Sequence, residues 1–420
     1  MERVTQRPPG RTLAAPRRPS KGISAHKGDT ANRGRSGSPP CTYDSPLVYG
    51  LDARRHSRRC RGSGKPTKDS PTFLDPEKRI WSYHSPVNSI AAETGDSPRG
   101  IYVIVPTPLK DNEELDSAGL KHLLNYYVES GCHGVVVLGS GGEFAYLSYE
   151  ERARVTKDAI EAVAGRVPLV VGAGFGGMVE TLKFIEEVGK WDVDGFLVIV
   201  PTYYPVEFDA VHDSFAVLCD ASRKPIFYYH YPQVTGLFFS PQQIAKLLSI
   251  EGMAGMKDSI VNMREMRAHI EWTGKLPNGH GKPIFSGHSF AIQDTLKRGG
   301  AGAMAILPSV VPRLIVETYN ACLSHDARRA KGLQDRILNL IPLMNDLSLP
   351  VSLQRSAFKL LFHSPIAVRN KPQSRVAVIK ETLRQLGHPI GNRVRSPQPQ
   401  LAEGEAQQIA TLIRRNELAM

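Results

Sequence analysis

Residues 134–151, GVVVLGSGGEFAYLSYEE, hold a short apolar run, a glycine-rich turn and the beginning of a helix. The run 134–138 is apolar throughout, which is typical of a parallel strand buried on both faces. Ser148 and Glu151 have the spacing of a capping box, in which each side chain binds a backbone N–H at the helix start. The stretch therefore predicts a strand, a glycine-rich loop and a helix in succession.

The same strand–helix unit recurs along the chain from Gly100 onward. A second helix start lies at residues 240–243, SPQQ, with proline at the first helical position. Eight units within about 220 residues favour a closed (β/α)8 TIM barrel of the α/β class over an open doubly wound sheet. The expected strands are 101–105, 134–138, 169–171, 196–200, 226–229, 253–256, 284–285 and 303–306.

No strand pattern returns after about residue 313. The remaining segments with helical periodicity are 327–343, 351–362, 375–386 and, beyond the break at Pro397 and Pro399, 401–415. We therefore expect three parts. Residues 1–99 form an N-terminal extension, residues 100–312 form the barrel, and residues 313–420 form a C-terminal helical region.

The N-terminal extension accounts for most of the formal net charge of +12. Residues 1–99 contain 19 Lys and Arg against 9 Asp and Glu, which leaves a balance of only +2 for the rest of the chain. Pro, Gly and Ser supply 33 of these 99 residues, so the segment cannot bury enough apolar surface to fold, and we predict disorder. Because the basicity lies outside the expected barrel, a nucleic-acid partner is not favoured.

The location follows from the same segment. The first 28 residues carry a single acid, Glu2, which suits a mitochondrial transit peptide, but four prolines there would break its amphipathic helix. We therefore expect a cytoplasmic protein, with a mitochondrial location as the alternative if residues 1–99 include a transit peptide. Whether these residues occur in the mature protein stays open.

Several other classes are excluded or disfavoured by composition and spacing. No apolar run approaches the roughly 18 residues of a membrane-spanning helix. Five scattered cysteines without a C-x-x-C pair argue against a disulfide scaffold and a cysteine zinc site. The 13 histidines include no His-x-His or H-E-x-x-H spacing, so no metal site is expected, and His133 and His230 are interpreted as structural.

Four of the expected strands end in polar or glycine-rich sequence, at residues 139–143, 201–204, 228–232 and 255–259. In a (β/α)8 barrel the active site lies at the carboxyl ends of the strands, so these groups should converge. Burial of Lys257 there would favour a neutral amine, which can attack a ketone and form an imine. A neighbouring tyrosine could relay protons, and the N–H groups of the glycine-rich turn could bind a carboxylate.

The order of the motifs along the chain also resembles that of a known protein family. Gly-Ser-x-Gly-Glu at 139–143, Tyr-Tyr at 203–204, Tyr-x-x-Pro at 229–232, Gly-x-Lys-Asp-Ser at 255–259 and the segment RSPQPQL at 395–401 follow one another. From about Gly100 to the C-terminus the sequence resembles the dihydrodipicolinate synthase / N-acetylneuraminate lyase family of Schiff-base aldolases. Each motif is weak alone, and their joint order and spacing carry the resemblance.

The resemblance implies a role for each matching residue. Lys257 would form an imine with pyruvate or another 2-oxo acid, without a metal or nucleotide cofactor, and Tyr229 would relay protons over it. Ser140 would bind the substrate carboxylate and pass on protons, with Gly141 and Gly142 completing the substrate-binding turn. The backbone carbonyl of Met304 would face the substrate. Tyr204 would be lent to the neighbouring subunit's site, which implies a homodimer or homotetramer.

At three places the sequence departs from the pattern of the family that it resembles, and these departures leave the substrate unidentified. Gly141 replaces a second Thr or Ser, and Val234 stands where the synthases carry an arginine that grips the second substrate's carboxylate. Residues 287–290, GHSF, stand where the sialic acid lyases carry acidic residues, while 256–259 and 143–144 look more like the 4-hydroxy-2-oxoglutarate aldolases. The branch, the aldehyde or imine acceptor, the reaction direction and any allosteric ligand therefore stay unresolved.

Two alternatives stand beside the lyase interpretation. A barrel that keeps its lysine without turnover would act as a binding protein for 2-oxo acids or polyanions. Residues 172–177, GAGFGG, fit the G-x-G-x-x-G pattern of a dinucleotide-dependent oxidoreductase, and they follow an expected strand. That strand is the third and not the first, so we interpret the glycines as a tight turn at the barrel mouth.

Overall fold

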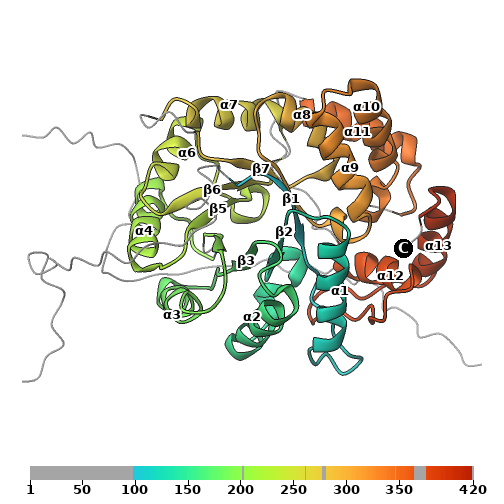
Figure 1. Cartoon of the computed structure of the whole chain (residues 1–420), viewed down its shortest axis with the longest axis horizontal. Helices are drawn as coiled ribbons and strands as arrows, with labels where there is room; N and C mark the ends of the chain where they lie inside the picture. Colours follow the sequence, from blue (N-terminus) through green and yellow to red (C-terminus); the bar gives the residue numbers. More distant parts are fainter. Residues whose placement is uncertain are drawn as a thin grey trace, which may run out of the picture. The chain divides into compact units, whose positions relative to one another are not determined.

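The computed structural model describes residues 98–418, apart from 201–202, 261, 277–280, 346 and 364–374. Eight parallel strands follow one another around a closed barrel (Figure 1). Pairing of β1 (Gly100–Ile104) with β8 (Gly302–Ala305) closes it. The other strands are β2 (Gly134–Val137), β3 (Leu169–Gly172), β4 (Gly195–Val198), β5 (Ile226–His230), β6 (Met253–Asp258) and β7 (Ile284–Ser286). The predicted (β/α)8 barrel is confirmed.

Helices follow the strands and surround the barrel (Figure 1). Both predicted capping boxes are present, at Ser148 before α2 and at Ser240 before α6. The short α5 (Pro232–Thr235) is an extra turn directly after β5. The helices that follow β1 to β8 are α1 (Ser117–Glu129), α2 (Tyr149–Val163), α3 (Met178–Val188), α4 (Phe208–Ala221), α6 (Pro241–Leu248), α7 (Met263–Thr273), α8 (Ile292–Lys297) and α9 (Pro312–Leu323).

Aromatic side chains fill the interior of the barrel. Tyr102, Phe227 and Phe285 are buried, and the ring centroids of Tyr102 and Phe285 lie 5.2 Å apart, edge to face. Gly134 gives the Tyr102 ring its space, because a Cβ atom at position 134 would lie 2.3 Å from that ring. The interior is therefore a packed core, and a ligand has room only at its end.

The C-terminal region consists of α10 (Ala327–Leu338), α11 (Val351–His363), α12 (Val376–Gln385) and α13 (Glu405–Arg415). The predicted helix 327–343 is wrong in its last turn: α10 ends at Leu338, and a separate 3₁₀ turn, Ile341–Met344, follows. Pro342 explains the break, because proline lacks the N–H that would continue the helix. The helix predicted at 401–415 begins later, after Gly404 in a left-handed conformation (φ 80°).

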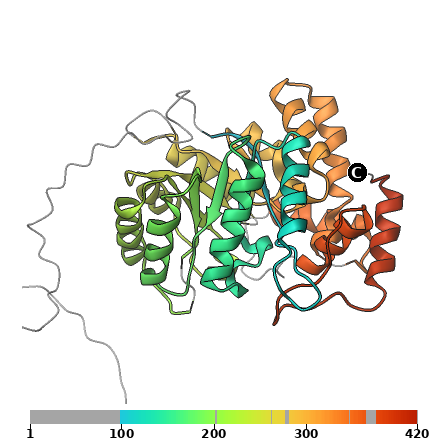
Figure 2. The same ribbon diagram turned by 60° about the horizontal axis from the view of Figure 1, so that its bottom comes forward.

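Helix α12 lies beside α1 in both views of the ribbon, and α13 packs on the far side of α12 (Figures 1 and 2). A contact between His122 of α1 and His388, with 3.1 Å between Nε2 and Nδ1, joins these segments. Helix α9 contacts both β1 and α10, and the boundary expected after residue 312 stays a prediction. Apart from residues 98 and 99, the expectation of disorder in residues 1–99 lies outside the described residues.

Within the part of the chain that the structure describes, no helix combines the length and apolar character needed to cross a membrane.

Candidate active site

A pocket lies at the carboxyl ends of the strands. Four predicted site residues line it together: Ser140, Gly141, Tyr229 and Lys257. The lining also includes Met344 and Val376, so the C-terminal region forms part of the wall. The other lining residues are Ile104, Tyr231, Ser259, Gly287, His288, Ser289, Phe290, Ala305, Ile306 and Leu307.

Lys257 lies on β6 with its side chain facing the pocket and only 3% exposed. Its Nζ lies 4.0 Å from the centroid of the Tyr229 ring. Among the described residues no carboxylate forms an ion pair with this amine. Burial lowers the pKa of the Lys257 ammonium from 10.5 to about 7, so a large fraction of the amine is neutral near neutral pH.

Tyr229 lies on the neighbouring strand, directly paired with Lys257 in the β5–β6 register. Its hydroxyl lies 3.2 Å from Oγ of Ser140, and Ser259 lines the same pocket. Burial raises the pKa of this phenol, although the side chains of Ser140 and Ser259 act to lower it. Tyr229 is therefore protonated at neutral pH and connected to a second hydroxyl through which a proton can pass.

Ser140 begins a 3₁₀ turn, Ser140–Gly142, directly after β2. The first N–H groups of such a turn lack partners inside it and can bind an anion. The turn is fixed from behind, because Oγ1 of Thr107 donates a hydrogen bond of 2.7 Å to the carbonyl of Gly142. A Cβ atom at Gly141 would lie 2.4 Å from Cδ1 of Ile306. Ile306 therefore fills the space that a side chain at position 141 would need.

The remaining predicted site residues lie elsewhere. Gly142 and Met304 are buried but are not among the described residues that line the pocket, although Ala305, next to Met304, lines it. Tyr204 lies in the loop after β4 and is 75% exposed, with its ring against Tyr203. The roles expected for these residues stay predictions.

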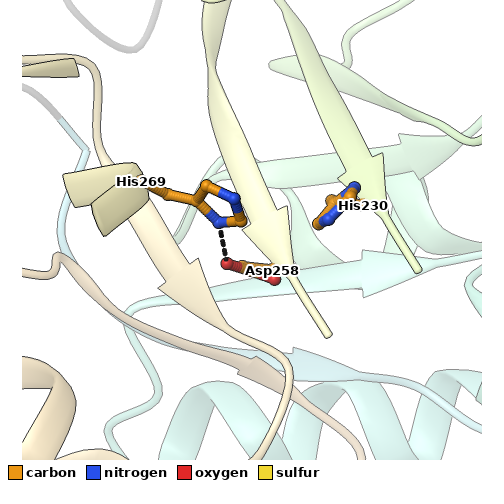
Figure 3. A group of neighbouring side chains, drawn as sticks. All are labelled: His230, Asp258 and His269. Carbon is orange, nitrogen blue, oxygen red and sulfur yellow. Dashed lines mark hydrogen bonds and ion pairs between the residues drawn. The ribbon is translucent and has the colours of Figure 1, made fainter. Parts of the chain in front are cut away.

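Behind the pocket, on the outer side of β5 and β6, lies a buried polar group of His230, Asp258 and His269 (Figure 3). Nδ1 of His269, on α7, lies 2.8 Å from a carboxylate oxygen of Asp258. The other carboxylate oxygen accepts a hydrogen bond from the backbone N–H of Ile260. The hydroxyl of Tyr228 lies 3.3 Å from Nδ1 of His230. The Asp258–His269 bond therefore links the end of β6 to α7, and the His230 ring of β5 packs against His269 with 5.4 Å between the ring centroids.

The same three side chains offer ligand atoms within 4.8 Å of one another, so they could hold a metal ion. None of them lines the pocket. Burial acts to raise the pKa of Asp258, but His269, His230 and the backbone N–H of Ile260 together outweigh it, and the pKa is lowered. Sequence spacing missed the group because its members come from three different elements.

Sequence reasoning also missed several residues of the pocket. Ser259 lies two positions after Lys257, and the alternation of side chains along a strand could have placed it on the same face. Met344 and Val376 follow the barrel in sequence, and no local motif connects them with the strand ends.

The fold and pocket together define a class: a parallel barrel with an unpaired, buried amine beside a phenol at its catalytic end. Comparison with known proteins then identifies the family. The model of the dihydrodipicolinate synthetase family matches residues 97–361. The chain belongs to this family, which supports a lyase-type enzyme over a dinucleotide-dependent oxidoreductase.

Individual relatives have different names. An uncharacterized DapA-like lyase of Halobacterium salinarum is 30% identical over 256 residues, which cover 60% of this chain and 82% of that protein. The putative 2-dehydro-3-deoxy-D-gluconate aldolase YagE of Escherichia coli K12 is 28% identical over 320 residues, covering 76% and 97%. The crystal structure of YagE in complex with pyruvate superposes with a TM-score of 0.67 at 27% identity, covering 76% of this chain and 99% of that chain. Dihydrodipicolinate synthase from Thermotoga maritima shares the fold, with a TM-score of 0.65 at 22% identity and coverage of 77% and 100%.

Proposed function

We propose that the protein is a class I aldolase, a lyase that condenses pyruvate or another 2-oxo acid with an aldehyde, or catalyses the reverse cleavage. The observation that carries this proposal is the Lys257 amine, which is buried, unpaired with any described carboxylate and 4.0 Å from the Tyr229 ring centroid. Family membership and the pyruvate complex of YagE support it.

Two hydroxyl groups of the pocket, those of Tyr229 and Ser140, can carry the protons that the reaction takes up and releases. Nζ of Lys257 attacks the keto carbon of the 2-oxo acid, and the former carbonyl oxygen leaves as water after taking protons relayed by Tyr229 and Ser140. The resulting imine withdraws electrons, so the adjacent carbon loses a proton and an enamine forms. That carbon then adds to the aldehyde, whose oxygen takes up a proton. Water finally hydrolyses the new imine and releases Lys257.

The turn Ser140–Gly142 is suited to the carboxylate of the 2-oxo acid through the Ser140 hydroxyl and the backbone N–H groups of Ser140 and Gly141, because the N–H of Gly142 already donates to the carbonyl of Gly139 at 2.9 Å. At the position where the synthases carry a carboxylate-binding arginine, this chain has the uncharged Val234, which is 44% exposed and not part of the described pocket lining. Among the described residues that line the pocket, Lys257 is the one lysine or arginine. These features disfavour dihydrodipicolinate synthesis and leave the 4-hydroxy-2-oxoglutarate aldolase-like and sugar-acid aldolase-like branches to be separated by assay.

The assay is release of pyruvate from a panel of 4-hydroxy-2-oxo acids, measured by a coupled dehydrogenase. We expect turnover of at least one member by the native chain and none above background by Lys257→Ala. The exposed Lys246, on the outer helix α6, provides the control variant Lys246→Ala, which should remain active. Turnover that survives Lys257→Ala would overturn the proposal. Saturable 2-oxo-acid binding without turnover of any substrate would instead favour the inactive barrel. The turnover rate of the native chain should be the same with and without EDTA.

A further inference from the structure

Glu143, the residue directly after the Ser140–Gly142 turn, connects this turn to the C-terminal region through an ion pair and hydrogen bonds. Its side chain is fully buried, and Nζ of Lys380, on α12, lies 2.5 Å from its Oε1. The Lys380 side chain is also fully buried, although 237 positions separate the two residues. Glu143 itself has a left-handed backbone (φ 60°), a conformation that a non-glycine residue adopts rarely.

Further contacts complete the surroundings of this carboxylate. Its Oε2 accepts hydrogen bonds from the backbone N–H of Arg395 at 2.7 Å and from Nε2 of Gln398 at 2.6 Å. Lys380 also donates to the carbonyl of Arg393 at 2.6 Å. Every partner of Glu143 named here is a donor, which suits an ionised carboxylate. All of these partners belong to the C-terminal region.

Neither Glu143 nor Lys380 lines the pocket. The ion pair instead connects two parts of its wall: Ser140 and Gly141 on the turn, and Val376 on α12. Ser140 lies 3.2 Å from the Tyr229 hydroxyl, so a displacement of the turn would disturb both the carboxylate site and the proton path. Displacements of about 1 Å at an active site can cost about 100-fold in rate.

We infer that the buried Glu143–Lys380 ion pair positions the Ser140–Gly142 turn for the carboxylate of the 2-oxo acid. The inference rests on the proposed function and adds two positioning residues to it. It makes the C-terminal region part of substrate recognition, because the pair holds the turn from a helix that follows the barrel.

The test compares variants of the full chain. Lys380→Met removes the ammonium, and Glu143→Gln combined with Lys380→Met replaces the pair with uncharged groups of similar shape, which relieves the buried charge. Gln398→Ala removes one donor to Glu143 and leaves the ion pair in place. The control is Arg384→Met, because Arg384 lies on the same helix but pairs with Glu381, away from the turn. Thermal unfolding reports whether each variant is folded.

The readout is borohydride trapping of the imine with two ketones. Pyruvate has a carboxylate for the turn to hold, whereas hydroxyacetone has none. We expect the half-saturating pyruvate concentration to rise by about 10- to 100-fold in Lys380→Met and in the double variant, and in the same direction but less in Gln398→Ala. The trapping rate with hydroxyacetone should change by less than about threefold, and Arg384→Met should match the native chain.

The outcomes separate this inference from the proposed function. Native chain that cannot be trapped with pyruvate or with any related 2-oxo acid would overturn both. Native chain that is trapped, together with folded variants that have unchanged half-saturation for pyruvate, would overturn the inference alone. Equal losses with pyruvate and hydroxyacetone would show that the pair only supports the fold. If Lys380→Met does not fold, the double variant and Gln398→Ala decide the result.

Discussion

Burial lowers the pKa of the Lys257 ammonium by desolvation, and in the proposed reaction this prepares the amine for attack. The next residue, Asp258, places its carboxylate on the opposite side of β6, where His269 and the N–H of Ile260 bind it. This alternation keeps a negative charge out of the pocket. A carboxylate beside the amine would instead stabilise the ammonium and remove the nucleophile.

The lowered pKa gives a prediction for pH dependence. Lys257 is protonated below about pH 7, so the initial rate of imine trapping at low pyruvate concentration should rise about tenfold per pH unit up to about pH 7. Above that pH the rate should level off. Trapping across a series of buffers at constant ionic strength measures the profile. A rate that kept rising to pH 10 would indicate an ordinary, hydrated lysine.

Removing the phenol of Tyr229 tests the proton relay. Tyr229→Phe keeps the ring beside Lys257 but loses the hydroxyl bonded to Ser140, so kcat should fall by about 100- to 10,000-fold. Steady-state kinetics with the best substrate of the panel gives the value. A rate close to that of the native chain would exclude Tyr229 from the mechanism.

At the scale of elements, the ends of β5 and β6 carry different chemistry on their two sides. Tyr229 and Lys257 face the pocket, while His230 and Asp258 face α7. Burial lowers the pKa of His230 from 6.5 to about 4, although the nearby Asp258 acts to raise it. The buried polar group of His230, Asp258 and His269 is therefore stable as long as His230 remains neutral.

The lowered pKa of His230 predicts that acid destabilises the folded chain. The unfolded chain binds a proton at His230 near pH 6.5, whereas the folded chain binds it only near pH 4. The free energy of unfolding should therefore decrease as pH falls from 6.5 to 4, by of order 3 kcal/mol from this group. In urea titrations, His230→Gln should show a smaller decrease over this range than His212→Gln, a control on the outer helix α4. An equal decrease in unfolding free energy from pH 6.5 to 4 in both variants would show that His230 is not the source of the acid sensitivity.

The sequence predicted the elements better than it predicted their contacts. Eight apolar runs and two capping boxes identify the barrel because strand burial and helix capping are local properties of the chain. The predicted helix 327–343 runs past the end of α10 because apolar periodicity alone does not show that Pro342 lacks the N–H a continuing helix needs. In the pocket, Ser140, Tyr229 and Lys257 could be brought together because parallel strands place their carboxyl ends at one mouth. The partners of Glu143 and Asp258 could not be predicted, because they lie on elements distant in the sequence and no sequence motif connects them.

At the scale of the whole molecule, Tyr203 and Tyr204 expose 84% and 75% of their surface beside β4. We propose that Tyr204 serves the site of a neighbouring subunit, which predicts at least a dimer in light-scattering measurements. Subunits of Tyr204→Phe and Lys257→Ala, each inactive or weak alone, should regain about a quarter of native activity after mixing and exchange, because half of the dimers then contain one complete site. No recovery in exchanged mixtures would place Tyr204 in its own subunit's site or outside catalysis.

Covalent capture of the substrate tests the central claim most directly. The native chain is incubated with borohydride and pyruvate, then with a panel of related 2-oxo acids, and is analysed by intact mass and peptide mapping. The account predicts one reduced adduct per chain, located on Lys257 and lost in Lys257→Ala. An unchanged mass with every 2-oxo acid, or an adduct on another side chain, would contradict it.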